Sequence, residues 1–173
     1  MLLKYYHFLL LVFCSFVIVS CDFNRTETLL TSADSVIEDN PDSAKALLDR
    51  LALVKLHSPQ DSAYYGLLYC QAQYELYNNP DTSLLSYSAD YYGMTKDKVR
   101  LQRCCYYMAM IIFDDAKENK KVISRLKQAE NLIPDVRDTL MTLKIYDALA
   151  SWNTYFMIKD QSLMYAGKVL QLS

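Results

Sequence analysis

The stretch "DSVIEDNPDSAKALLDRL", Asp34–Leu51, contains the break between helices on which the fold depends. Pro41 cannot continue a preceding helix, but its fixed backbone angle suits the first turn of a new one. Asn40 can cap that turn, and the carboxylate of Asp42 lies near the positive end of the helix dipole. The stretch therefore predicts one helix that ends just before Asn40 and a second that begins at Pro41.

The same break recurs at Asn79-Pro80-Asp81, 39 residues later, which indicates an internal repeat. Apolar residues at helical spacing predict helices within residues 27–39, 42–54, 62–79, 82–94, 99–118, 120–134, 136–160 and 161–173. Because the connections are only a few residues long, consecutive helices must pack antiparallel as hairpins. Fifteen tyrosines against three glycines and four prolines also favour long helices. We therefore expect an all-α fold of about four antiparallel helical hairpins.

The third hairpin resembles the tetratricopeptide repeat. That family places aromatic and small residues on the first helix, then a small residue and a boundary proline on the second; the matching residues are Tyr106, Ala109, Phe113, Leu126, Ala129 and Pro134. Ala129 fits because a small side chain lets two helix backbones approach closely. The fourth unit repeats the pattern with Tyr146, Leu149 and Ala150, and the second unit with Tyr74 and Ala89.

The resemblance covers residues 26–173 with a spacing of 39 to 40 residues, against 34 in the family. It implies a right-handed α-solenoid in which each hairpin packs on the next and the first helices line a groove. The groove-facing places of the family fall on Tyr65, Leu68, Glu75, Tyr107, Ile111, Asp114, Lys144, Asp147 and Thr154. Such a mix suits a bound peptide. The alternative is that tyrosines at helical spacing simply form the core.

The N-terminus has the layout of a signal peptide. Lys4 is the only charge before the apolar run "FLLLVFCSFVIV", Phe8–Val19, and small Ser20 follows the run. An uncleaved membrane helix is the alternative, but it needs roughly 20 apolar residues. Counted from Tyr5 to Val19, the run has only 15. We therefore expect residues 1–20 to be a cleaved leader.

The tetrapeptide Ile18-Val19-Ser20-Cys21 resembles a bacterial lipobox. The resemblance implies that the Cys21 thiol receives a diacylglyceryl group, that the leader is cut just before it, and that residues 21–25 form a lipidated tether. More than one acyl chain makes membrane anchoring stable. We therefore expect a protein of the bacterial cell envelope, facing the periplasm or the cell surface. The opening "TLLTSADSVIEDNPDSAKALLDRL" also resembles tetratricopeptide-like lipoproteins of Bacteroidota.

Few residues carry chemistry. After the leader, His57 is the only histidine, and no phosphate-binding glycine motif or nucleophile elbow is present. Cys70, Cys104 and Cys105 are an odd set without a CxxC pair, so neither a zinc site nor a disulfide framework is indicated, although an oxidised pair with Cys70 stays open. A net charge of −2 does not suit nucleic acid. We expect no enzyme, no cofactor and no metal.

The expected function is a membrane-anchored helical-repeat scaffold that binds a protein or peptide outside the cytoplasm. Two alternatives belong to other classes: an extracytoplasmic sensory input domain shortened from a larger signalling protein, and a hydrolase or glycan-binding component. No polar capping helix follows the last hairpin, and such caps normally cover the apolar end of a solenoid. We therefore expect either that the last hairpin is covered by a partner or, through self-association, by a second copy of the chain, or that this is the leading part of a longer array.

Replacing Cys21 tests the anchor. Cys21→Ser is expected to yield an uncleaved, unacylated precursor, because the lipidation chemistry needs the thiol as its nucleophile. Incorporation of radiolabelled palmitate measures the effect, and Cys14→Ser within the leader is the matched control that keeps its label. Normal labelling of Cys21→Ser would contradict the assignment.

Overall fold

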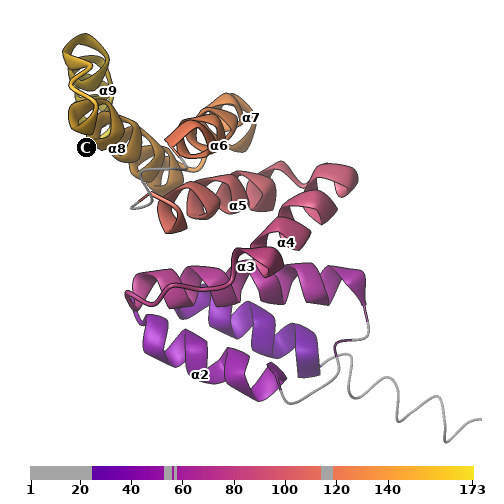
Figure 1. The fold of residues 1–173 in the computed structure, drawn as a ribbon. Helices are drawn as coiled ribbons and strands as arrows, with labels where there is room; N and C mark the ends of the chain where they lie inside the picture. Colours follow the sequence, from indigo (N-terminus) through magenta and orange to yellow (C-terminus); the bar gives the residue numbers. More distant parts are fainter. Residues whose placement is uncertain (1–24, 53–55, 57, 114–118) are drawn as a thin grey trace, which may run out of the picture.

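The computed structural model describes residues 25–52, 56, 58–113 and 119–173. Within these ranges all regular secondary structure is helical, which confirms the all-α prediction (Figure 1). An N-terminal helix covers residues 25–36. It is followed by α2 (Pro41–Ala52), α3 (Pro59–Glu75), α4 (Thr82–Thr95), α5 (Lys98–Ile111), α6 (Asn119–Asn131), α7 (Ile133–Val136), α8 (Thr139–Tyr155) and α9 (Lys159–Leu172).

Side chains at the helix starts set the boundaries. The predicted start at Pro41 is confirmed, and the side chain of Asn40 accepts a hydrogen bond from the Ser43 amide at 3.0 Å. At the second break α4 begins at Thr82, as the sequence predicted, because the Asp81 carboxylate accepts from the Ser83 amide and so caps the helix.

Each first helix from the second hairpin onward has a side-chain cap. Ser58 caps α3, Asp97 caps α5 and Asp138 caps α8. These caps recur at intervals of 39 and 41 residues, close to the spacing that the sequence indicated. The predicted helix 136–160 is shorter in the structure, because Ile133–Val136 forms the separate turn α7, which the left-handed backbone of Arg137 ends.

The helices pack in chain order. Within hairpins α3 packs on α4, α5 on α6 and α8 on α9, and between hairpins α4 packs on α5 and α6 on α8. The first helices also contact one another, α3 with α5 and α5 with α8, whereas α2 packs on α3 (Figure 1). Each hairpin therefore covers the apolar face of its neighbour.

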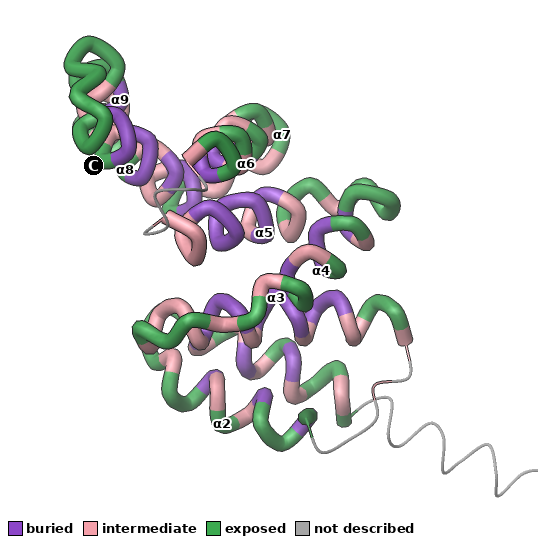
Figure 2. Tube along the Cα trace, in the orientation of Figure 1, coloured by how far each residue is buried: buried purple, intermediate pink, exposed green. Residues whose placement is uncertain are grey.

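Helix α3 joins two hydrophobic clusters. Leu68 and Ala72 pack with the N-terminal helix and α2, whereas Leu67 and Cys70 pack with the cluster that continues to α9. A helix that is covered on both sides is apolar around most of its circumference, and buried residues run along α3 (Figure 2). The first hairpin therefore depends on α3 for its core.

The side chains of Cys70, Cys104 and Cys105 are buried, and their thiols are free. Burial raises the pKa of Cys70 to about 11, and it also raises the pKa of Cys104 and of Cys105 above the usual value. Because the thiolate is the reactive form, these side chains are chemically quiet at neutral pH.

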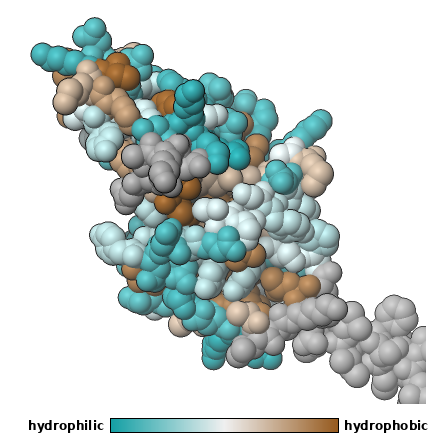
Figure 3. All heavy atoms as spheres, viewed as in Figure 1, coloured by the Kyte–Doolittle hydropathy of each residue, from teal (hydrophilic) through white to brown (hydrophobic). Residues whose placement is uncertain are grey.

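The last hairpin leaves apolar side chains in solvent. In α9 only Tyr165 is buried, and its hydroxyl lies 3.1 Å from the Glu130 carboxylate of α6. Large exposed apolar residues of α9 are Leu163, Met164, Leu170 and Leu172. Apolar residues reach the surface at this end of the molecule (Figure 3). Among the described residues, no helix combines the length and apolarity that crossing a membrane requires.

Gly66 sets the closest approach of α3 to α4. An added Cβ at this residue would lie 2.6 Å from the hydroxyl oxygen of Ser88 and 2.9 Å from the carbonyl oxygen of Leu84. The Ser88 hydroxyl in turn lies 2.7 Å from the Ala63 carbonyl oxygen of α3. The sequence pattern assigned small-residue contacts to Ala89 and Ala129, which are buried, but it missed Gly66.

Gly66→Ala is therefore expected to lower the free energy of unfolding by about 1–3 kcal/mol, because α3 and α4 must separate to admit the methyl group. Gly93→Ala is the matched control: nothing lies within 4 Å of its Cβ position, so the change should raise stability by up to about 1 kcal/mol. Urea denaturation measures both. A Gly66→Ala protein as stable as the unmodified chain would contradict the packing.

Candidate functional site

Three polar residues occupy the same place on successive first helices. Tyr64, Arg103 and Lys144 each lie six residues beyond the cap of their helix, on α3, α5 and α8. All three side chains reach toward the N-terminal helix and hydrogen-bond to its carboxylates. Together with Asp34, Glu38, Gln71, Glu75 and Tyr107 they form what we call the central polar network.

Asp34 of the N-terminal helix is held by two of these groups. The Arg103 guanidinium donates to it at 2.8 Å and the Tyr64 hydroxyl at 2.5 Å, and Arg103 also donates to the Gln71 side chain at 2.6 Å. Burial by itself would raise the pKa of Asp34. The hydrogen bond and charge of Arg103, with the Tyr64 hydrogen bond, outweigh burial and hold that pKa below the usual 3.8. Asp34 is therefore ionised at neutral pH.

Lys144 joins the last hairpin to the first two. Its ammonium lies 2.5 Å from the Glu38 carboxylate, 3.4 Å from Glu75 and 3.3 Å from the Tyr107 hydroxyl. Glu38 also accepts from Gln71, and Glu75 accepts from Tyr107 at 2.9 Å. Burial, followed by the charges of Glu38 and Glu75, raises the pKa of Tyr107. Its phenol therefore stays protonated and acts as a donor.

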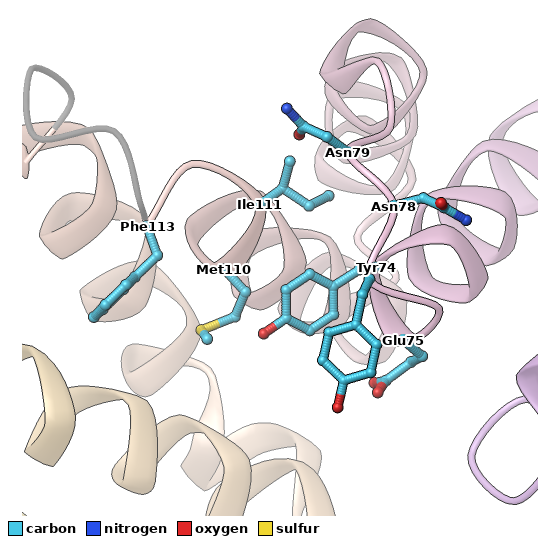
Figure 4. A pocket seen from close by; sticks show the side chains of 8 residues that line it. Tyr74, Glu75, Asn78, Asn79, Met110, Ile111 and Phe113 are labelled. Carbon is cyan, nitrogen blue, oxygen red and sulfur yellow. The ribbon is translucent and has the colours of Figure 1, made fainter.

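A pocket of about 810 Å³ lies beside this network, between the C-terminal ends of α3 and α5. Helix α3 supplies Tyr74 and Glu75, and α5 and its last turn supply Met110, Ile111 and Phe113 (Figure 4). The loop to α4 completes the wall with Tyr77, Asn78 and Asn79. We call this site the Tyr77 pocket. Its lining combines aromatic rings, aliphatic side chains, two amides and one carboxylate.

Tyr77 is held in an unusual backbone conformation. Its φ is 57°, and its side chain is 99% exposed. The Tyr77 amide donates to the Tyr74 carbonyl and the Asn78 amide to the Gln73 carbonyl, which is the Schellman pattern at the end of a helix. Glycine usually occupies this place because a Cβ is unfavourable there by about 1–2 kcal/mol. The fold therefore fixes a large aromatic ring in solvent at the pocket rim.

Met157 repeats this feature at the end of α8. Its φ is 58° and it is 91% exposed, and the amides of Met157 and Ile158 donate to the carbonyls of Thr154 and Asn153. Met157 does not line the Tyr77 pocket. It therefore provides a natural comparison for Tyr77.

The structure brings together some of the residues that the family pattern assigned to a groove. Glu75, Tyr107 and Lys144 contact one another, and Glu75 and Ile111 line the Tyr77 pocket. Tyr107 is wholly buried, so its contacts are with the network rather than with solvent.

The other assigned residues lie elsewhere. Leu68 is wholly buried against the first hairpin, and Tyr65 stacks on Tyr69 with ring centres 5.5 Å apart. Asp147 and Thr154 are exposed on α8, where the Thr154 hydroxyl contacts Ser162 of α9. Asp114 lies outside the described residues, as do the leader, Cys21 and His57.

Sequence reasoning missed several members of the site. Asp34 and Glu38 are one helical turn apart on an otherwise apolar helix face, and Arg103 interrupts a buried stretch of α5; both patterns could have indicated inward-facing charges. Tyr77 carried no such signal, because sequence does not reveal a left-handed backbone at a tyrosine. Within the described residues, no group of histidine, cysteine and carboxylate side chains could hold a metal ion.

Comparisons with known proteins give no relative. No protein-family model matches the chain, and searches of curated proteins and of solved structures return no significant match.

Arg103→Met is expected to lower the free energy of unfolding by about 2–3 kcal/mol, because it leaves the Asp34 carboxylate partly buried without its cation. Lys98→Met is the matched control: its pair with Asp135 is half exposed, so the loss should stay below about 1 kcal/mol. Chemical denaturation at pH 7 measures both. Equal losses of unfolding free energy in the two variants would contradict a larger contribution of the central polar network than of an exposed ion pair.

The same comparison has a pH dependence. Because the pKa of Asp34 is lower in the folded chain than the usual 3.8, its stabilisation is fully present above that value. It is lost as the pH falls through the lower, folded-state pKa. The stability difference between the unmodified chain and Arg103→Met should therefore shrink below about pH 4.

Proposed function

We propose that this chain is a lipid-anchored, tetratricopeptide-like helical scaffold of the cell envelope that binds a segment of another protein in the Tyr77 pocket. The observation that carries the proposal is the pocket itself, with an exposed tyrosine fixed at its rim. A concave site lined by aromatic and aliphatic side chains with a few polar groups is typical of binding sites. Exposed aromatic anchors are typical of protein interfaces.

The packing order of the helices supports a solenoid. Each hairpin contacts the next, successive first helices contact one another, and their caps recur at nearly constant intervals. These are the relations expected when repeats cover one another's apolar faces. The right-handed tetratricopeptide arrangement is our proposal for how the hairpins stack.

The lining of the pocket favours a peptide over a reacting substrate. Asn78 and Asn79 offer amide groups that can pair with a peptide backbone, and Met110 and Ile111 offer an apolar wall for a side chain. Glu75 is the one carboxylate among the described lining residues, so these residues supply no pair of acids for acid–base catalysis.

The position of the pocket is compatible with an anchor at Cys21. Asp34 contacts Tyr64, and Glu38, one turn later, contacts Gln71, so the N-terminal helix runs in the same direction as α3. Residue 25, where the described chain begins, therefore lies toward the N-terminal end of α3, and the pocket lies at its C-terminal end. Since the 17 residues of α3 span about 25 Å, the pocket would open away from the membrane that holds the lipid.

Tyr77→Gly separates binding from stability. Glycine relieves the left-handed backbone, so the variant should be more stable by about 1 kcal/mol. Removal of the rim anchor should nevertheless weaken binding of peptides selected from a random displayed library by about tenfold or more. Fluorescence anisotropy with the selected peptides measures the affinity.

Met157→Gly is the matched control: it should gain similar stability and keep the full affinity, because Met157 lies outside the pocket. Peptides that bind Tyr77→Gly as tightly as the unmodified chain would overturn the proposal. So would a library that yields no binder.

The expected self-association through the last hairpin stays a prediction, which the exposed apolar residues of α9 support.

A further inference from the structure

The wall of the Tyr77 pocket that meets the central polar network is negatively charged. Glu75 lines the pocket, and its side chain is 30% exposed. Its two partners, the Tyr107 hydroxyl and the Lys144 ammonium, both contact Oε1. Within the described part of the chain, no hydrogen bond reaches Oε2 of Glu75. A carboxylate can accept several hydrogen bonds, so Glu75 keeps capacity for a further donor.

Lys144 shares its single positive charge between two carboxylates and so does not fully neutralise Glu75. Its short contact, at 2.5 Å, is with Glu38, whereas its distance to Glu75 is 3.4 Å. Burial, and then the charges of Tyr74, Glu75, Asp147 and Glu38, raise the pKa of Tyr106, in keeping with an excess of acids on this side of the network.

The charges of the whole region do not balance. Asp34, Glu38 and Glu75 supply three carboxylates, whereas Arg103 and Lys144 supply two cations; Arg100, which also lies near Asp34, is paired with Asp97. Arg103 is committed to Asp34 and Gln71. The described residues around the network therefore have an excess of negative charge, which favours a ligand that brings a cation.

The remaining lining suits the rest of a cationic side chain. The rings of Tyr74 and Phe113 lie at the pocket (Figure 4), Tyr77 is a third aromatic lining residue, and ring faces attract ammonium and guanidinium groups. Met110 and Ile111 form an apolar wall between them. Lysine and arginine have long aliphatic stems that pack on such surfaces while the charged end reaches a polar group.

We propose that the Tyr77 pocket selects a basic side chain of the bound segment, with the aliphatic stem against Met110 and Ile111 and the cation at the Glu75 carboxylate. Arginine should bind better than lysine, because a guanidinium is less strongly hydrated than an ammonium and can stack on aromatic rings such as that of Tyr74. This inference rests on the proposed function and names the chemistry of its ligand. The pocket would then distinguish bound segments by the charge of one side chain as well as by its apolar surface.

Two small probes test the inference directly. Nα-acetyl-arginine methylamide and its neutral isostere, the corresponding citrulline derivative, are titrated separately into the folded chain and followed through the methyl resonances of Met110 and Ile111. The arginine probe should bind saturably and about tenfold more tightly than the citrulline probe, because a hydrogen bond to a charged group is stronger than a neutral one.

Glu75→Gln isolates the carboxylate. Glutamine keeps an oxygen that can accept from Tyr107, and circular dichroism confirms that the variant folds. Its affinity for the arginine probe should fall to that for the citrulline probe. Asp49→Asn, which removes an acid from α2, is the matched control for net charge and should leave the arginine affinity unchanged.

Three results would overturn the inference: equal affinities for the two probes, no saturable shift with either, or an arginine affinity that Glu75→Gln does not change. Saturable binding of the neutral trisaccharide cellotriose at Met110 and Ile111, without binding of the arginine probe, would assign the pocket to glycans and would also overturn it. Selected peptides that need Tyr77 but show no preference for basic residues would refute this inference alone, because the proposed function would stand.

Discussion

The ion pairs from Arg103 and Lys144 to the N-terminal helix are the contacts on which the arrangement of the first helices depends. Hydrophobic packing joins helices that are adjacent or nearly adjacent along the chain, such as α3 and α5, whereas the Lys144–Glu38 contact joins residues 106 positions apart. Helix α3, covered on both sides, links the two hydrophobic clusters, and the polar network holds the same helices together across their inner faces. The first hairpin is therefore held by two kinds of interaction: a continuous core through α3 and a set of partly buried charges.

The network also determines where a ligand can bind. The central positions on the first helices contact one another through polar side chains, so they are not open to a partner. A ligand that entered the middle would have to displace Arg103 or Lys144 from carboxylates, and breaking such pairs costs several kcal/mol. Space remains at the C-terminal ends of α3 and α5, where Glu75 belongs to both the network and the pocket wall. The residues that hold the helices together and the residues that line the pocket are therefore adjacent, and Glu75 belongs to both sets.

Much of the fold was predictable because its signals are local. Pro41 and Asn40 act through backbone geometry and one hydrogen bond, so the start of α2 follows from sequence. The start of α4 follows in the same way from the cap by Asp81, whereas the separate turn α7 depends on the left-handed backbone of Arg137. The candidate site was only partly predictable. Glu75 and Lys144 could be placed by repeat register, whereas their contact with Glu38 depends on how distant hairpins meet. The role of Gly66 depends in the same way on the approach of Ser88.

The left-handed tyrosine at the pocket rim has a consequence for how this sequence can drift. Random mutation followed by selection for stability alone would favour glycine at position 77, because glycine removes the backbone penalty and loses no buried surface. A tyrosine kept there more often than side chains are kept at the other left-handed positions, Lys96, Arg137 and Met157, would indicate a role other than folding. Among natural variants of this chain, tyrosine at position 77 would be expected where the pocket still binds its ligand. Glycine would be expected where that binding has been lost. Position 157, with the same backbone but no pocket, would show the rate at which glycine appears without that constraint.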